Sequence, residues 1–218
     1  MDPMDIEPGP LSVPTWHVVV PVKGRSGAKT RLVPPPGVDR GELALAMACD
    51  ALVALRRVVP VDRVVVVTSD AGLAASVRAA GAHVVADPGT GLVPAVEAGL
   101  AVLPLHVDRA VLLGDLPALR SDELAAALSA GGGQERSFVA DRGDTGTTLL
   151  LARAGTPHDV HFGTGSAAAH AAAGYRPLAL EVPSLRTDVD DADDLRAAVS
   201  LGCGPATTAL LPDAVCSP

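Results

Sequence analysis

Short runs of β-branched residues alternate along the chain with longer segments in which apolar residues recur at helical spacing. The first run is HVVVPV at residues 17–22, and the next segment carries Leu43, Met47 and Leu55 before Pro60 ends the pattern. Strands that are separated by helices of this length pair in parallel, because a parallel connection needs a crossover segment. The alternation therefore predicts an α/β fold with three layers and a mostly parallel sheet. The predicted strands are residues 17–22, 63–68, 83–86, 110–113, 137–140, 147–151 and 177–182, and the predicted helices are residues 39–58, 71–80, 92–102, 121–130, 166–173 and 192–201.

The composition narrows the kind of core that this fold can have. Hydrophobic residues make up 48% of the 218 residues, but aromatic residues only 2%, so Val, Leu and Ala must fill the interior. Such thin side chains suit a parallel sheet covered by Ala-rich helices. The length and the lack of an internal repeat or linker indicate one domain at residues 15–203. We expect a disordered arm at residues 1–14 and a loose tail at residues 204–218.

Charge and cysteine content exclude several classes of function. The formal net charge is −8 and there is no basic run, which argues against nucleic acid as a partner. Cys49, Cys203 and Cys216 lie far apart without a C-x-x-C pair, which argues against a disulfide framework or a zinc site. The first residues do not resemble a signal peptide, and no apolar run approaches the roughly 20 residues that span a bilayer. These features predict a cytoplasmic protein that does not bind membranes.

A basic segment with two glycines, KGRSGAKTRL at residues 23–32, follows the first predicted strand. Ligands of parallel sheets bind at the carboxyl ends of the strands, beside the point where the strand order reverses. The glycines let main-chain N–H groups face an anion, and Lys23, Lys29 and Arg31 add positive charge. A Walker loop is excluded, because Lys23 and Ala28 stand where that motif requires glycine. We predict a triphosphate site here, with a solvated basic loop as the alternative.

Acidic residues follow two later segments. Asp115 comes directly after the fourth predicted strand, in LGDLP, where a carboxylate needs a partner or a cation; capping of the next turn is the alternative. Asp188 and Asp190 are two residues apart, so in an extended segment their carboxylates share one side and repel unless a cation joins them. Capping and the dipole of the following helix account for Asp191, Asp193 and Asp194 but leave Asp188 and Asp190 unexplained.

The ligand chemistry of these aspartates favours magnesium. An EF-hand is excluded, because the segment that starts at Asp188 has no glycine at the sixth loop position and has Val199 at the twelfth. Hard carboxylate oxygens without histidine or cysteine partners suit Mg²⁺. We therefore predict Mg²⁺ on Asp115, Asp188 and Asp190.

A second small-residue segment, FGTGS at residues 162–166, opens the Ala-rich helix. N–H groups at a helix start and the Ser166 hydroxyl predict another anion site, to which Thr148 would add a hydroxyl. A simple Ser N-cap after a flexible turn is the alternative. Three nearby histidines match no metal-binding spacing, and we assign them to loops and the surface; they are His158, His161 and His170.

With these residues in place, the chain resembles the phosphoenolpyruvate and 2-phospho-L-lactate guanylyltransferase family of coenzyme F-420 biosynthesis. The resemblance covers about residues 18–201. It rests on PVK at residues 21–23 with AKTRL at 28–32, DPGTGL at 87–92, GDLP at 114–117, GTGS at 163–166 and TDVD at 187–190.

The resemblance implies a Rossmann-like nucleotidyltransferase fold of the nucleotide-diphospho-sugar transferase type. It implies GTP as the donor and phosphoenolpyruvate as the acceptor, giving enolpyruvyl-diphospho-5'-guanosine and pyrophosphate. It also implies that the acceptor phosphate binds Thr148, Gly163 and Ser166, and that Mg²⁺ binds the three aspartates. The residues that we predict to bind the nucleotide are Val22, Lys23, Gly24, Lys29, Arg31, Asp87 and Gly91.

The predicted reaction is an in-line attack of an acceptor phosphate oxygen on the α-phosphorus of GTP. The nucleophile is ionised at neutral pH and needs no general base, so Lys23, Lys29 and Arg31 act catalytically by holding the departing pyrophosphate. A downstream transferase that takes the product directly is a candidate partner, and the sequence indicates no oligomeric state. The alternatives are a guanylyltransferase for 2-phospho-L-lactate, another nucleotidyltransferase acting on a molybdopterin or sugar phosphate, and a regulatory module that binds nucleotide without catalysis.

Overall fold

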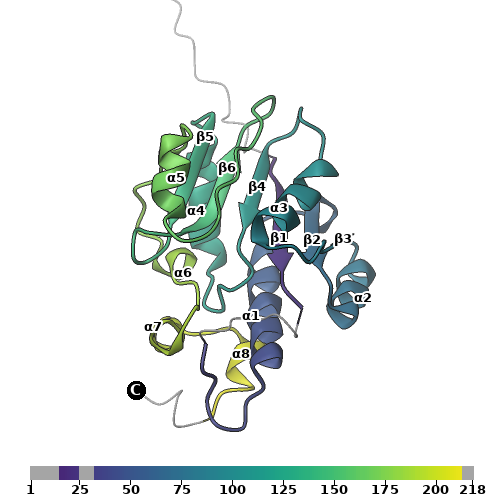
Figure 1. The fold of residues 1–218 in the computed structure, drawn as a ribbon, viewed down its shortest axis with the longest axis vertical. Coiled ribbons are helices and arrows are strands. Elements are labelled where there is room, and N and C mark those ends of the chain that lie inside the picture. The colour runs from purple at the N-terminus through teal and green to yellow at the C-terminus, as the bar shows by residue number, and fades with distance from the viewer. Residues whose placement is uncertain (1–14, 25–31, 213–218) are drawn as a thin grey trace, which may run out of the picture.

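A seven-stranded sheet forms the centre of the protein in the computed structural model, which describes residues 15–24 and 32–212 (Figure 1). The strand order is β3-β2-β1-β4-β6-β5-β7, so the chain adds strands first on one side of β1 and then on the other. The strands are β1 His17–Val22, β2 Val64–Thr68, β3 His83–Ala86, β4 Arg109–Leu112, β5 Arg136–Ala140, β6 Thr147–Ala152 and β7 Arg176–Pro177.

The sheet is mostly parallel, as the sequence predicts. Strands β3, β2, β1 and β4 pair in parallel, and so do β5 and β7. Strand β6 is antiparallel to both β4 and β5. This reversal follows from the short connection between β5 and β6, because a six-residue turn can join only antiparallel neighbours.

Helices cover both faces of the sheet and complete three layers. They are α1 Arg40–Leu55, the 3-10 helix η2 Val61–Arg63, α2 Ala71–Ala79, α3 Leu92–Ala101, α4 Ser121–Gly131, α5 Ser166–Ala172, α6 Pro183–Arg186, α7 Ala192–Leu201 and α8 Pro205–Thr208. Helices α1, α2, α4 and α6 contribute to one buried cluster, while α3 and α5 contribute to the other, and Figure 1 shows α3 and α5 on the same side of the sheet. Among the helices in the described part of the chain, none combines the length and the apolar character that crossing a bilayer requires.

Alternation along the strands sends thin side chains to both faces. Val18 and Val20 pack on the α1 and α4 side, whereas Val19 packs on the α3 side. In β6, Leu149 faces the first side and Leu150 the second. Because both faces are covered, the strands read as continuous apolar runs, and Val, Leu and Ala build the core as the composition indicates.

A third apolar cluster lies outside the main layers. It joins the start of α1 to the loop after Asp115 and to the segments around α7 and the chain end. Its buried members are Leu32, Leu43, Met47, Ala118, Val189, Leu195, Ala198 and Leu211. This cluster anchors loops rather than strands, among them the segments around Asp115 and Val189.

The prediction of a strand at residues 177–182 is wrong. Strand β7 contains only Arg176 and Pro177, and the Leu178 N–H donates the last bond toward β5, to the Phe138 carbonyl. Beyond it, Leu180 and Val182 donate to carbonyls only two residues back, so the chain turns on itself. Leu178 and Leu180 still pack against the core, and this burial produced the alternating pattern without a neighbouring strand to pair with.

The described part of the segment expected to form a loose tail is ordered. Residues 205–208 form α8, which packs against α1, and Leu211 is only 7% exposed. A buried carboxylate of α1 fixes this segment, and the sequence contains no local signal for so distant a contact. The predicted arm at residues 1–14 and residues 213–218 lie outside the described residues.

The assignment of the three histidines to loops and the surface is wrong for His170, whereas His158 lies in a loop as predicted but is partly buried. His170 lies in α5 and is fully buried; it accepts the His161 N–H at Nε2, so its Nδ1–H donates to the Thr147 hydroxyl at 2.9 Å. His158 donates from Nε2 to the Arg109 carbonyl and accepts from the Tyr175 hydroxyl. Burial lowers the pKa of His158 to about 3 and that of His170 to about 4.

These histidines should make the fold sensitive to acid. As the pH falls from about 6.5 toward 4, His158 and His170 become protonated in the unfolded chain but stay neutral in the folded chain. The free energy of unfolding therefore decreases. Each contributes about 1.4 kcal/mol per pH unit in this window. Urea unfolding at pH 7 and pH 5 should show a smaller loss for His158→Gln than for the wild type, while His83→Gln, on an exposed edge, should keep the wild-type loss. An unchanged loss in His158→Gln would contradict this origin.

Candidate active site

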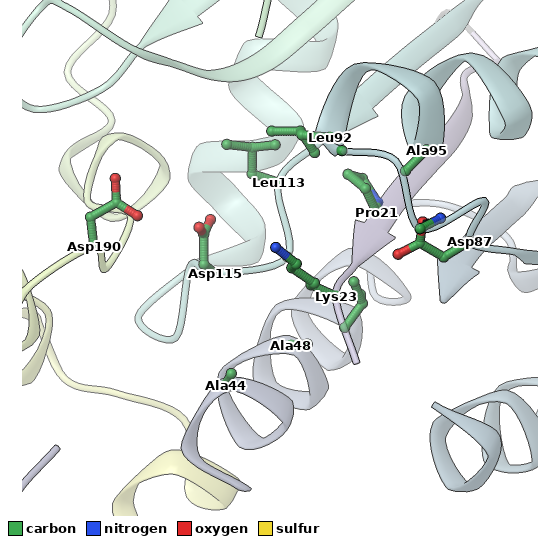
Figure 2. A pocket seen from close by; sticks show the side chains of 14 residues that line it. Pro21, Lys23, Ala44, Ala48, Asp87, Leu92, Ala95, Leu113, Asp115 and Asp190 are labelled. Carbon is green, nitrogen blue, oxygen red and sulfur yellow. The ribbon is translucent and has the colours of Figure 1, made fainter. Parts of the chain in front are cut away.

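A cavity of about 360 Å³ opens at the carboxyl ends of β1, β3 and β4 (Figure 2). Pro21 to Lys23 enter it from the end of β1, Asp87 from the segment after β3, and Leu113 to Asp115 from the segment after β4. This is the place where the strand order reverses, because the chain continues from β1 to β2 on one side while β4 lies on the other. The cavity therefore lies where parallel α/β sheets bind their ligands.

Two helices provide most of the apolar wall. Ala44 and Ala48 of α1 are one helical turn apart, and Leu92 and Ala95 come from the first turn of α3. Three of these four residues are alanines, which leave room for a flat ligand between the helices. These four residues were not predicted from the sequence, although two alanines spaced by four on a helix that follows a ligand loop are a usable signal.

Most of the predicted nucleotide-binding residues that the structure describes line this cavity. They are Val22, Lys23, Asp87 and Gly91. The Lys23 side chain is exposed, and Figure 2 shows its amine directed into the cavity on the side of Asp115. Gly24 is buried just behind, where a β-carbon would lie 2.6 Å from the Ser69 Oγ. Lys29 and Arg31 lie outside the described residues, so their roles stay predictions.

Asp115 reaches the cavity because the chain before it runs very close to β1. A β-carbon on Gly114 would lie 3.1 Å from a Val22 methyl group and 3.2 Å from the Pro21 carbonyl oxygen. A larger residue would push these atoms apart, so glycine favours this close approach, as the sequence indicated. Asp115 itself is half-buried at the cavity rim.

Asp188 and Asp190 are held beside Asp115 by the residue between them. The Val189 N–H donates to the Asp115 carbonyl at 3.0 Å, and the Val189 side chain is fully buried in the third cluster. With Val189 directed inward, the two flanking carboxylates share the opposite side, as the spacing predicted. Each of the three aspartates offers a carboxylate oxygen within 4.8 Å of the others, and Figure 2 shows Asp115 and Asp190 on facing segments.

The next helix is capped by neighbouring carboxylates. Asp191 accepts the N–H groups of Asp193 and Asp194, and Asp194 accepts the Asp191 N–H in return, which completes a capping box. The bonds from Asp194 and Asp193 lower the pKa of the Asp191 carboxyl. Capping thus occupies Asp191 and Asp194, as predicted, and fixes the start of α7 directly after Asp190.

The donor set fits a hard divalent cation. Oxygens in one Mg²⁺ shell lie at most about 4.2 Å apart, twice the usual ~2.1 Å bond, so small side-chain rotations would bring the three carboxylates into a common shell. Carboxylates this close together repel one another. A divalent cation bound between them would remove that repulsion.

The residues predicted to bind the acceptor phosphate are all described by the structure, but none of them lines this cavity. The Thr148 hydroxyl is fully buried and donates to the Val139 carbonyl at 3.5 Å, although its own carbonyl accepts from Leu113 of the cavity. Gly163 is exposed, and Ser166 is 2% exposed. The N–H groups of Ser166 and Ala167 already donate to carbonyls within the protein, so this helix start offers fewer donors than the sequence suggested.

A buried polar network that the sequence did not reveal supports Ser166. Its hydroxyl lies 3.3 Å from the Thr147 hydroxyl, which accepts from His170. The register shift between β5 and β6 leaves Thr148 as an extra residue, and this bulge turns Thr147 toward α5. A bulge has no reliable sequence signal, so the place of Thr147 in this network could not be predicted from the sequence.

The metal site can be tested directly by Mn²⁺ binding in the presence of a non-hydrolysable GTP analogue. Asp115→Asn and Asp188→Asn each remove one charged ligand and should weaken Mn²⁺ binding by more than the roughly 10-fold that loss of an outer partner costs. Asp193→Asn changes a nearby exposed carboxylate that is not in the group and should bind as the wild type does. Equal binding by all four proteins would remove these aspartates from the metal site.

The chain is similar to known proteins over most of its length. Residues 16–211 match the family described as Guanylyl transferase CofC like. The chain is 49% identical over 201 residues to a phosphoenolpyruvate guanylyltransferase of Thermomonospora curvata, covering 90% of this chain and 88% of that protein. It is 47% identical over 208 residues to a phosphoenolpyruvate guanylyltransferase of Geodermatophilus obscurus, covering 92% and 96%.

The fold is similar to that of a solved protein described as a nucleotide-diphospho-sugar transferase from Desulfovibrio desulfuricans G20. The TM-score is 0.61 at 16% sequence identity, covering 93% of this chain and 97% of that one. At this identity the likeness concerns the fold alone. From the family match over nearly the whole described chain and the identity to curated relatives, the chain belongs to the CofC-like guanylyl transferase family and is a nucleotidyltransferase.

Proposed function

We propose that this enzyme transfers GMP from GTP to phosphoenolpyruvate, giving enolpyruvyl-diphospho-5'-guanosine and pyrophosphate for coenzyme F-420 biosynthesis. The observation that carries the proposal is the group of three carboxylates within 4.8 Å, of which Asp115 and Asp190 line a cavity at the switch in strand order. The acceptor is proposed from the curated relatives, which are named for phosphoenolpyruvate.

The walls of the cavity support one orientation of the nucleotide. Its apolar part lies between α1 and α3, where Ala48 and Ala95 leave space for a base. Lys23 and Asp115 lie together on one side, so the phosphates of GTP would lie there, next to the proposed ion. Asp87 lies on the other side, where a carboxylate can accept hydrogen bonds from N–H groups of guanine or ribose hydroxyls.

The proposed chemistry is a single displacement at the α-phosphorus. An oxygen of the acceptor phosphate forms a bond to this phosphorus while the bond to the bridging oxygen breaks, and pyrophosphate leaves with the electron pair. The attacking oxygen is already ionised, so the residues described here orient groups and balance charge and move no proton. We propose Lys23, with Lys29 and Arg31, as the cations that hold the departing pyrophosphate.

Magnesium is the proposed ion, and Asp115, Asp188 and Asp190 are its proposed ligands. When bound, Mg²⁺ supplies charge neutralisation at the reacting phosphates. The carboxylates come from two segments that the Val189–Asp115 backbone bond joins, so their separation is set by the fold. Such fixed geometry supports catalysis by positioning, since little reorganisation is needed during the reaction.

Pyrophosphate release tests the proposed function. With Mg²⁺, GTP and phosphoenolpyruvate, the wild type should release pyrophosphate, and Asp115→Asn and Asp188→Asn should be about 100- to 1000-fold slower while remaining folded. Asp193→Asn is the matched control and should retain its rate. Replacing phosphoenolpyruvate by 2-phospho-L-lactate or a sugar phosphate should reduce release; a faster reaction with either, or GTP binding without release, would contradict the proposal.

The acceptor site is a separate proposal, placed on Thr148, Gly163 and Ser166. It is supported by the hydroxyl of Ser166, which lies beside the exposed Gly163 and donates to Thr147 in this structure; on binding of the acceptor it would turn to donate to the phosphate instead. Ser166→Ala should raise the KM for phosphoenolpyruvate at least about tenfold, the loss of one hydrogen bond to a charged group, and leave the KM for GTP nearly unchanged. Thr164→Ala removes an exposed hydroxyl two residues earlier and should change neither. An unchanged KM for phosphoenolpyruvate in Ser166→Ala would leave that hydroxyl a structural role only.

A further inference from the structure

Asp50 is a buried carboxylate that the proposed mechanism does not use. It lies on α1, is 6% exposed, and accepts the N–H groups of Ala206 at 3.0 Å and Thr207 at 2.8 Å. These are N–H groups of the first turn of α8, which have no partner inside that helix. Asp50 therefore caps α8, which follows it by more than 150 residues, and fixes that helix against α1.

Gly204 forms the other side of this contact. A β-carbon at this position would lie 2.4 Å from the Asp50 carboxyl carbon, so no larger residue fits without displacing the carboxylate. The Gly204 N–H donates at 2.8 Å to the carbonyl of Pro117, two residues after Asp115. The segment at residues 204–212 is thus bonded to α1 on one side and to the Asp115 loop on the other.

The same segment closes the third apolar cluster beneath the aspartates. Leu211, near the end of the described chain, packs there with Ala118 from the Asp115 loop and with Val189. Val189 in turn donates its N–H to the Asp115 carbonyl. An unbroken series of contacts therefore leads from Asp50 through Gly204 and Pro117 to the loops that hold all three carboxylates.

We propose that Asp50, together with the segment at residues 204–212 that it anchors, positions the three aspartates for the metal ion. Asp50 is a positioning residue: it lines no part of the cavity, whereas Ala44 and Ala48 of the same helix do. This inference rests on the proposed function, since it concerns the metal site of that reaction. In this inference, the segment at residues 204–212 holds the two aspartate loops at a fixed separation.

Replacement of Asp50 or Gly204 should weaken metal binding from opposite sides of the same contact. In Asp50→Asn, one of the two N–H donors faces an amide NH₂, and in Gly204→Ala the new methyl group displaces the carboxylate. Mn²⁺ binding with a non-hydrolysable GTP analogue should weaken by about tenfold in both, the low end of the range for direct partners of metal ligands, because Asp50 acts through the Asp115 loop and not on a ligand itself. A raised Mg²⁺ concentration should restore most of the kcat, because the ligands themselves are intact.

Asp108 provides a control with a matched loss of stability. It is 7% exposed, accepts the Ala154 N–H at 2.9 Å and pairs with Arg153 at 2.8 Å, but it lies before β4 whereas Asp115 follows that strand. Asp108→Asn should lower the Tm about as much as Asp50→Asn and leave Mn²⁺ binding unchanged. All proteins are measured well below their Tm, with circular dichroism to verify that they are folded.

The outcomes separate the inference from the proposed function. If the wild type binds Mn²⁺ tightly and Asp50→Asn and Gly204→Ala lose only Tm, as Asp108→Asn does, the positioning role is wrong while the metal site stands. If the wild type does not bind Mn²⁺, or Asp115→Asn binds it equally well, the proposed function fails first. Weaker binding in both Asp50→Asn and Gly204→Ala, but not in Asp108→Asn, supports the inference.

Discussion

One backbone hydrogen bond, from the Val189 N–H to the Asp115 carbonyl, joins the two segments that carry the acidic site. Asp115 follows β4, and Asp188 and Asp190 lie more than 70 residues later, between α6 and α7. The buried Val189 side chain fixes which way the neighbouring carboxylates point. If this bond were broken, the separation of the three carboxylates would no longer be set by the fold, and a shared cation could not be held in one geometry.

The rest of the architecture forms the cavity beside these carboxylates, in which we propose that the nucleotide binds. A sheet built from Val, Leu and Ala lets helices α1 and α3 lie close to its faces, and the reversal of strand order opens a space between β1 and β4. The alanines of both helices line that space, with Lys23 at the side of the aspartates. The cavity is thus a consequence of topology and of side-chain size, and the polar residues at its rim determine what it binds.

Much of this arrangement could be predicted because it depends on local patterns. Strand β3 and helix α7 begin and end at the predicted residues, since β-branched runs and capping signals determine them. Asp188 and Asp190 could be expected to share one side because capping explained the acidic residues after them, and the structure brings both close to Asp115. The prediction of a strand at residues 177–182 was wrong because Leu178 and Leu180 are buried without a neighbouring strand, and their burial alone produces a strand-like alternation.

Features that depend on distant contacts could not be predicted. The capping of α8 by Asp50 joins residues more than 150 positions apart, and the burial of His170 depends on a bulge that turns Thr147 toward α5. In each case the residue type carries no local signal, and its role depends on a partner that is distant in the sequence. The same holds for Ala44 and Ala48, which line the cavity only because α1 crosses the ends of the strands.

In the proposed reaction, three aspartates that are distant in the sequence share one divalent ion beside the nucleotide. Crystals grown with Mn²⁺ and a non-hydrolysable GTP analogue, measured at the manganese absorption edge, test it most directly. We expect an anomalous peak about 2.2 Å from carboxylate oxygens of Asp115, Asp188 and Asp190 and from a phosphate oxygen of the nucleotide. A nucleotide bound in the cavity with manganese elsewhere, or with these carboxylates turned away from it, would contradict the account.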